Sequence, residues 1–383
     1  MNTFDVVIVG GGIIGTSTAF ELAAEKLRVL LVDRQQPGEE ASPAAGGMLS
    51  PESDGPEAVP VAPLTKESLR IYPQFVASIE EAAGTSAHLK LEGAIELFYG
   101  PLAEAERDKL ATEHRRVGFI AEPTTIEAAT ELGGELNRSA RAAAWFPEEG
   151  TLEPRHLMDA ALKAARGRGV EIRANSPVTS ILREGNRCTG VVAGGEKIAA
   201  KYVVVAAGCF SCLIARESAW FGRYAPTRPV RGQILILRPK KTALRKVVRS
   251  ERRYLVPRSD GTILAGSTLE EAGFEKHLTP AGVRRIADGA IELVPALADA
   301  EICETWAGLR PGTPDNLPIL GPTDVDGLLM ATGHYRSGIL LAPVTARLMR
   351  DWITRGRVEI PVKAFSPLRF KEDKQSTVAT KSV

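Results

Sequence analysis

The chain has 383 residues, of which 44% are hydrophobic and 25% are charged, and its formal net charge is +1. This balance is ordinary for a globular protein of one large domain or two, and it argues against a nucleic-acid or anionic-membrane partner. No apolar run approaches the roughly 20 residues that a membrane span needs. Because the first strand begins by Asp5, we expect neither a signal nor a transit peptide, and we expect a cytoplasmic protein.

The first part of the chain predicts a strand–turn–helix–strand unit with a glycine-rich turn. Residues 5–9 are apolar and β-branched, residues 16–24 have helical spacing, and residues 28–32 form a second apolar run. The pattern G-x-G-x-x-G lies between the first run and the helix and is formed by Gly10, Gly12 and Gly15. Asp33 ends the second run, where its carboxylate can accept hydrogen bonds from a ribose diol. The unit predicts a dinucleotide site and leaves NAD and FAD both open.

Each glycine of this turn has its own expected role. Gly10 permits the tight turn, Gly12 lets a pyrophosphate approach a backbone without a Cβ, and Gly15 lets the helix pack closely on the strand. The helix N-terminus offers free N–H groups and the positive end of a dipole to the phosphates. The alternative is a turn between strand and helix that needs glycine for packing alone.

The next part of the chain has no second nucleotide signal. Residues 34–62 are rich in Gly, Pro, Ala and Ser and predict a loop, and residues 64–83 predict a helix. Residues 89–99 read as a strand pair, and residues 101–137 as a charged helical region. The block 85–150 is therefore expected to belong to a second domain.

Apolar strands return in the middle of the chain. After an Ala- and Leu-rich helix at 151–168, residues 169–181 predict two short strands. The tract 187–206 predicts three more strands, the last of which closes on Ala207 and Gly208.

The remaining elements are expected to form an antiparallel α+β insertion and a final strand and helix. Residues 220–300 alternate a helix at 280–293 with strands at 233–237, 254–257 and 262–265. A strand at 328–331 then stops at Gly333, and a long amphipathic helix begins near Ser337 or Gly338. The polar tail 371–383 is predicted to be disordered.

The four cysteines do not predict a disulfide framework in so long a chain. Cys209 and Cys212 form a C-x-x-C pair, but no second cysteine or histidine pair completes a zinc set. We interpret them as two small residues of a loop, and we predict no metal site.

Three predicted strands, ending at Val9, Ala206 and Ala331, finish in small residues. In doubly wound sheets, ligands bind beyond the carboxyl ends of the strands. A site that draws on the start, middle and end of the chain suits a long, extended cofactor, so the pattern favours FAD over NAD.

Five segments carry a resemblance to a known family: GGGIIG, AAGGM, RYLVPR, WAGLRPGTPD and GHYRSGILLAP. Over about residues 4–366 the chain resembles the D-amino-acid oxidase family of flavoproteins, and within it the glycine oxidases linked to thiamine biosynthesis. The resemblance implies an α/β fold with a Rossmann-like, doubly wound FAD-binding sheet assembled from residues 1–84, 151–219 and 306–366. An inserted antiparallel α+β substrate domain would comprise residues 85–150 and 220–305.

The family's FAD contacts map onto the glycine turn, the residues at the ribose and the loop and helix at the flavin. Asp33 stands where glutamate is commoner, and the segment around Ala41 and Ser42 carries a proline and an extra glycine relative to the family. Val178 matches the residue whose backbone holds the adenine. The expected cofactor-binding residues are Gly10, Gly12, Ile13, Ile14, Gly15, Asp33, Arg34, Ala41, Ser42, Gly46, Gly47, Met48, Val178, Ala207, Gly208, Gly333, His334, Arg336, Ser337, Gly338, Ile339 and Leu340.

The resemblance assigns the substrate to Arg310, Tyr254 and Arg336. Arg310 offers a planar fork suited to a bidentate carboxylate contact, Tyr254 offers a hydroxyl donor, and Arg336 lines the flavin edge. FAD is expected to be non-covalent, because Gly308 stands where sarcosine oxidases carry the attaching cysteine.

The implied activity is oxidation of glycine and other small amines or D-amino acids to the imino acid, with reduction of O2 to H2O2. The resemblance also implies a homotetramer. Two other readings stay open: a quinone-linked D-amino-acid or sarcosine-type flavin dehydrogenase, and a non-enzymatic nucleotide-binding or sensor protein.

Overall fold

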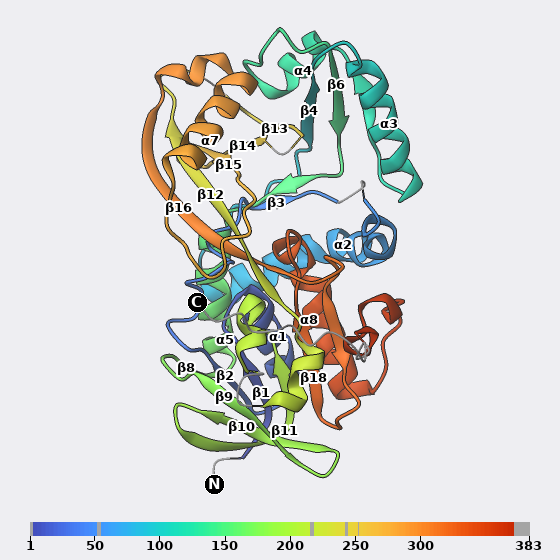
Figure 1. The fold of residues 1–383 in the computed structure, drawn as a ribbon, viewed down its shortest axis with the longest axis vertical. Coiled ribbons are helices and arrows are strands. Elements are labelled where there is room, and N and C mark those ends of the chain that lie inside the picture. Colours follow the sequence, from blue (N-terminus) through green and yellow to red (C-terminus); the bar gives the residue numbers. More distant parts are fainter. Residues whose placement is uncertain (1–2, 52–54, 215–217, 242–243, 252, 371–383) are drawn as a thin grey trace, which may run out of the picture.

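Two large β-sheets organise the chain in the computed structural model, which describes residues 3–51, 55–214, 218–241, 244–251 and 253–370. Figure 1 shows one sheet with α1, α5 and α8 in the lower half and the other with α3, α4 and α7 in the upper half. The tail 371–383, predicted to be disordered, lies outside the described residues. The helices are α1 (Ile13–Ala24), α2 (Ala58–Ala83), α3 (Ala103–Arg116), α4 (Ile126–Gly133), α5 (Pro154–Gly167), α6 (Ser211–Ile214), α7 (Pro280–Leu293) and α8 (Gly338–Arg355).

The first sheet has the order β17-β18-β11-β1-β2-β8, and β9 and β10 extend from β11 as an antiparallel pair. Pairing is parallel from β18 through β11 and β1 to β2 and β8. Its strands are β1 (Thr3–Val9), β2 (Val29–Val32), β8 (Glu171–Arg173), β9 (Val178–Glu184), β10 (Arg187–Ala193), β11 (Glu196–Val205), β17 (Ile319–Pro322) and β18 (Leu328–Thr332). The carboxyl ends of β1, β11 and β18 therefore meet at one edge, as expected from the three strand ends.

The apolar side chains of β1 point alternately to the two faces of this sheet and contribute to a hydrophobic core on each face. Val6 and Ile8 pack in one buried cluster with residues of α1, α2, α5 and α8, whereas Val7 and Val9 pack in another with residues of β9, β10 and β11. Side chains of a strand alternate between faces, so an all-apolar strand must be covered on both sides. The expected α/β fold, with a parallel sheet assembled from the start, middle and end of the chain, is confirmed.

The second sheet has the order β16-β12-β15-β14-β13-β4-β6-β5 and is antiparallel except where β13 pairs with β4. Its longest pair joins β12 and β16, from Arg228 opposite Gly312 to Arg238 opposite Glu301, with one register shift between Ile236 and Leu237. Both strands run from the upper sheet down to the lower one in Figure 1. The strands are β4 (Ala94–Phe98), β5 (Glu122–Thr124), β6 (Ala142–Phe146), β12 (Arg228–Arg238), β13 (Val247–Ser250), β14 (Arg253–Pro257), β15 (Ile263–Gly266) and β16 (Glu301–Gly312).

A short antiparallel pair, β3 (Met48–Leu49) with β7 (Gly150–Thr151), is separate from both large sheets. Of the helices in the described ranges, none is long and apolar enough to cross a membrane.

Several boundaries differ from the sequence-based expectation. α2 begins at Ala58, inside the expected loop, and runs through Pro63 and Pro73. The expected charged helical region is broken by β5, a short strand held by pairing with β6 rather than by an apolar pattern of its own. The tract 187–206 forms two strands instead of three, because β11 continues unbroken to Val205. A domain boundary between residues 305 and 306 would fall inside β16, and the division into domains stays a proposal.

Candidate functional site

A cavity of about 1130 Å³ lies where the carboxyl edge of the first sheet faces the second sheet. Its volume exceeds the roughly 300–1,000 Å³ typical of small-molecule sites, so it has room for a large cofactor. All the expected site residues line it except Gly15 and Gly333. Those that do are Gly10, Gly12, Ile13, Ile14, Asp33, Arg34, Ala41, Ser42, Gly46, Gly47, Met48, Val178, Ala207, Gly208, Tyr254, Arg310, His334, Arg336, Ser337, Gly338, Ile339 and Leu340.

The glycine turn between β1 and α1 is closed by direct backbone contacts. Gly10 has φ +106°, and a Cβ there would lie 2.6 Å from the carbonyl oxygen of Ala206, so the backbone just after β11 leaves no room for a side chain. A Cβ on Gly15 would lie 1.9 Å from the carbonyl oxygen of Gly10. Gly15 therefore serves the packing of α1 on β1, which explains why it does not line the cavity.

The first turn of α1 provides a cradle for an anion. The N–H of Ile13 donates to the hydroxyl of Ser42 at 2.9 Å, and a Cβ on Gly12 would lie 3.2 Å from the same oxygen. The N–H groups of a first helical turn have no acceptor within the helix, and the helix dipole is positive there. A pyrophosphate oxygen could accept the same N–H of Ile13 that the Ser42 hydroxyl accepts in this structure, so this part of the cavity fits FAD.

Asp33 faces the cavity with its carboxylate held by two backbone donors. The N–H of Gly11 donates to Oδ2 at 2.7 Å and the N–H of Gln35 donates to Oδ1 at 3.0 Å. Burial raises the pKa of Asp33, and these hydrogen bonds oppose the rise. Each oxygen keeps acceptor capacity for a ribose hydroxyl. The adjacent Arg34 lies over the ring of Phe210 at 3.5 Å, where cation–π contact fixes its guanidinium.

Tyr254 enters the cavity between two glycines. A Cβ on Gly46 would lie 3.2 Å from its hydroxyl oxygen, and a Cβ on Gly266 would lie 2.6 Å from it. The backbone on the Gly46 side is held by Arg258, which donates to the carbonyl oxygens of Gly46 and Leu152, each at 3.1 Å. Arg258 was not predicted as a site residue, although it stands in the RYLVPR segment.

The N-terminus of α8 opens on the same cavity. Gly333 has φ +72°, and a Cβ there would lie 2.4 Å from Cγ2 of Thr313, so it makes the turn out of β18 rather than a cavity wall. The Tyr72 hydroxyl on α2 donates to the carbonyl oxygen of Ile339 at 2.9 Å. His334 is buried with Nε2 3.0 Å from Oγ1 of Thr345, and burial lowers the pKa of His334 to about 3, so its ring is neutral.

The two expected substrate arginines differ in their surroundings. Arg310, on β16, is partly buried, whereas Arg336 is exposed at the cavity lining. Arg310 donates from Nη1 to the carbonyl oxygens of Thr268 at 3.2 Å and Arg231 at 3.4 Å, and from Nη2 to the hydroxyl of Ser267 at 2.7 Å. A guanidinium has five N–H donors. Within the described part of the chain, at least two of them remain for a ligand, the number that a bidentate carboxylate contact needs.

A buried charge cluster at the cavity wall was missed by the sequence analysis. Arg249 donates to Glu96 at 2.7 Å and forks onto Glu149, with Nη2 2.9 Å from Oε1. Burial alone would lower the pKa of Arg249, but the two carboxylates raise it overall. These three residues come from separate parts of the chain and form no motif, so only the fold reveals the cluster.

The cysteine pair holds a turn and is not linked. Cys209 and Cys212 are both free, and the thiol of Cys212 donates to the carbonyl oxygen of Cys209 at 3.2 Å. Burial raises the pKa of Cys209 to about 12, which leaves it a poor nucleophile although it lines the cavity. No metal site was predicted; among the described residues, one group has ligand atoms close enough to hold a metal, formed by His88, Glu153 and His156.

Comparisons with known proteins agree with this geometry. The glycine oxidase of Pseudomonas putida is 33% identical to this chain and is aligned over 94% of this chain and 98% of its own length. The hydrogen cyanide synthase subunit HcnC of Pseudomonas aeruginosa is 30% identical over 97% of both chains. The bifunctional protein ThiO/ThiG of Trichormus variabilis is 32% identical over 98% of this chain, which spans only 56% of that longer protein.

A solved structure shares the whole fold. The crystal structure of glycine oxidase from Geobacillus kaustophilus superposes with a TM-score of 0.90 at 30% identity, covering 96% of this chain and 99% of that one. The family model described as DAO, FAD dependent oxidoreductase, matches residues 5–352. Together with the cradle at α1 and the cavity that continues to Arg310, this match shows that the chain belongs to the DAO family of FAD-dependent oxidoreductases.

Proposed function

We propose that this chain is an amino-acid oxidase that acts on glycine and on other small amines or D-amino acids. The substrate loses a hydride from Cα and a proton from nitrogen to become the imino acid, and O2 accepts the two electrons to become H2O2. Water then hydrolyses the imino acid to the 2-oxo acid and ammonia.

The observation that carries this proposal is the position of Arg310. Its guanidinium lines the same cavity as the glycine turn, with donors still available for a carboxylate and with Tyr254 also at the wall. A bidentate arginine contact fixes both the position and the orientation of a carboxylate. A nucleotide sensor would have no use for such a contact beside the flavin, so the arrangement favours an enzyme that holds an amino acid.

Within this proposal the chain's own residues place the reacting groups. Arg310 binds the substrate carboxylate, Tyr254 donates its hydroxyl to the same carboxylate, and Arg336 lies at the flavin edge. The α1 cradle and Asp33 hold the pyrophosphate and ribose, and Gly46 to Met48 and the start of α8 enclose the flavin. When bound, FAD supplies the hydride acceptor and passes the electrons on to O2. Correct placement, rather than an acid–base residue, is what this chemistry requires from the protein.

The same proposal covers the wider features expected from the sequence. Residues 1–84, 151–219 and 306–366 form the FAD-binding domain, and residues 85–150 and 220–305 form the substrate domain. The protein works in the cytoplasm as a homotetramer and takes part in thiamine (thiazole) biosynthesis. The name of the bifunctional ThiO/ThiG relative supports the last point, although this chain spans about half of that protein.

Peroxide formation on adding glycine to the aerobic holoenzyme tests the proposal. Glycine should yield H2O2, glyoxylate and ammonia in equal amounts, and an added quinone should not be needed. Turnover that requires a quinone would instead support the flavin dehydrogenase, and no turnover with any amine would support a sensor.

A second candidate is the role of a hydrogen cyanide synthase subunit, because HcnC is nearly as similar to this chain as glycine oxidase is. The two candidates differ in product. Glyoxylate without cyanide supports the oxidase, and cyanide released from glycine would support the second candidate.

A further inference from the structure

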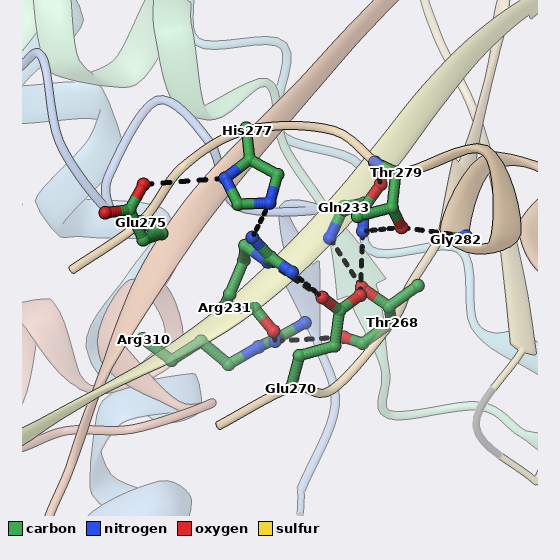
Figure 2. Close-up of polar contacts among 9 residues, drawn as sticks. All are labelled: Arg231, Gln233, Thr268, Glu270, Glu275, His277, Thr279, Gly282 and Arg310. Atoms are coloured by element: carbon green, nitrogen blue, oxygen red, sulfur yellow. Dashed lines mark hydrogen bonds and ion pairs between the residues drawn. The ribbon is translucent and has the colours of Figure 1, made fainter. Parts of the chain in front are cut away.

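A network of polar side chains lies next to Arg310, as Figure 2 shows. We propose that Glu270, together with Arg231 and Gln233, positions Arg310 for the substrate carboxylate. This inference rests on the proposed function, because it takes Arg310 to be the carboxylate anchor. It concerns positioning residues, which act through Arg310 and do not touch the substrate themselves.

The acceptors that hold Arg310 lie mainly on one short segment after β15. The hydroxyl of Ser267 and the carbonyl oxygen of Thr268 take hydrogen bonds of 2.7 and 3.2 Å from the guanidinium. The remaining acceptor, the carbonyl oxygen of Arg231 on β12, is 3.4 Å from Nη1. The direction of the Arg310 fork therefore depends on where the segment 267–270 lies relative to β12.

Backbone and hydroxyl contacts fasten this segment to β12. The N–H of Arg231 donates to the carbonyl oxygen of Glu270 at 2.9 Å, and the N–H of Glu270 donates back to Arg231 at 3.0 Å. The N–H of Gln233 donates to Oγ1 of Thr268 at 2.9 Å. Arg231 thus contacts Arg310 through its carbonyl and Glu270 through both its backbone and its side chain.

The carboxylate of Glu270 is the centre of the side-chain contacts. Arg231 donates from Nε to Oε2 at 2.7 Å and also from Nη2, while the Gln233 amide donates to Oε1 at 2.8 Å. Arg231 is 5% exposed and Gln233 is 0% exposed. Burial alone would raise the pKa of Glu270, but hydrogen bonds from Thr268, Arg231 and Gln233 lower it overall, so the carboxylate stays ionised.

The network also reaches the N-cap of α7. The side-chain oxygen of Gln233 accepts the N–H of Thr279 at 2.9 Å, and its amide nitrogen lies 3.0 Å from the Thr279 hydroxyl. That hydroxyl caps α7 by accepting the N–H of Gly282 at 3.1 Å. Nη1 of Arg231 lies 3.3 Å from Nε2 of His277. An experiment must therefore separate the positioning of Arg310 from a purely structural role in anchoring α7.

Removing the Glu270 carboxylate leaves a buried guanidinium and a buried amide without their shared acceptor. Such groups rearrange to recover hydrogen bonds, and the acceptors of Arg310 shift with them. Misplacing a binding group by about 1 Å can cost on the order of 100-fold. The net positive charge beside Arg310 would also rise, because Arg231 would lose its counter-ion.

The test measures acetate binding to the holoenzyme from the change in the flavin absorption spectrum. Wild type should bind acetate, and Arg310→Ala should bind it far more weakly but still measurably at high acetate concentration. Glu270→Ala should raise the dissociation constant of acetate and the KM for glycine by about 10- to 100-fold, with FAD content and kcat at saturation little changed. Glu270→Gln, which keeps one oxygen acceptor, should recover part of the affinity. Glu67→Ala is the matched control, because Glu67 has a side-chain exposure of 22% against 23% for Glu270 and accepts two hydrogen bonds from the guanidinium of Arg70.

The decisive measurement is the double variant Glu270→Ala/Arg310→Ala. If Glu270 acts through Arg310, adding Glu270→Ala to Arg310→Ala should not weaken acetate binding further. If Glu270→Ala weakens acetate binding by the same factor in wild type and in Arg310→Ala, Glu270 has a structural role and the inference is overturned. Unchanged acetate binding in folded Glu270→Ala would also overturn it. If Glu270→Ala does not fold, Arg231→Lys, which replaces the fork by a point charge, should show the same loss; wild-type affinity in that variant would overturn the inference. Failure of wild type to bind acetate would overturn the carboxylate anchor itself, which is a separate result.

Discussion

Gly232 on β12 lies against the guanidinium of Arg310, the proposed carboxylate anchor, and a substitution of Gly232 tests that role directly. A Cβ at this position would lie 2.3 Å from Nη1, 2.6 Å from Nη2 and 2.7 Å from Cζ of Arg310. The guanidinium therefore lies flat against a backbone without a side chain. Gly232→Ala should displace the Arg310 guanidinium and leave the backbone in place, because the group in contact is the end of a side chain.

The size of the effect follows from these distances. Ordinary contact between such atoms needs about 3.5 Å, so the guanidinium must move by roughly 1 Å. A shift of that size breaks the fork geometry and can cost on the order of 100-fold. We expect Gly232→Ala to lower kcat/KM for glycine by about that factor, and to weaken acetate binding equally, while its FAD content matches wild type.

The matched control is Gly167→Ala at the end of α5, where the nearest atom to a new Cβ is the carbonyl oxygen of Ala82 at 3.9 Å. This variant should have wild-type kinetics. For amines without a carboxylate, the kcat/KM of Gly232→Ala should be almost that of wild type. Full affinity for acetate in Gly232→Ala would refute the placement of Arg310 as the anchor.

Four further predictions follow from the site and the core. Arg310→Ala should lose about 2–5 kcal/mol of transition-state binding for glycine, roughly 30- to several-thousand-fold in kcat/KM, and Arg310→Lys should recover only part; equal losses with amines that lack a carboxylate would contradict this role. Gly12→Val should yield folded, colourless protein, because the side chain would fill the cradle at α1; a full complement of FAD would contradict the cradle. Acid precipitation should leave yellow FAD in the supernatant, because Gly308 has no nucleophile; a coloured pellet would show covalent attachment. Burial lowers the pKa of His114 from 6.5 to about 4. The contribution of His114 to the free energy of unfolding is therefore fully present above pH 6.5 and is lost between pH 6.5 and 4, where the unfolded state takes up a proton. His114→Phe should reduce the dependence of the free energy of unfolding on pH in this range, as measured by denaturant titrations.

The first sheet and the turns at its carboxyl edge were predictable because their signals are local. The glycine turn, the acidic residue after β2 and the small residues after β11 and β18 each follow an apolar strand. Parallel strands bring their carboxyl ends to one edge, so strand ends far apart in sequence predicted one site. Gly15 has the packing role expected of it, and neither Gly15 nor Gly333, which makes a turn, lines the cavity.

The surroundings of Arg310, the proposed carboxylate anchor, were not predictable in the same way. Gly232 matters because it lies under Arg310, and Glu270 matters because it faces Arg231 across a strand edge. The contact of Gly232 with Arg310 depends on the register of β12 with β16, and that of Glu270 with Arg231 on the bridge between β12 and the segment after β15. No local pattern in these segments sets either pairing. The boundaries at α2 and β5 were missed for a related reason, because tertiary packing overrode local composition.

An anaerobic titration of the holoenzyme with glycine tests the central claim most directly. Each portion of glycine should bleach the visible absorbance of oxidised FAD, and admitting air should restore the absorbance and release H2O2 equimolar with the flavin that was reduced. The same titration with folded, FAD-loaded Arg310→Ala should need far more glycine. If glycine leaves the wild-type absorbance unchanged, or if a quinone but not air restores it, the account of this chain as an amino-acid oxidase is wrong.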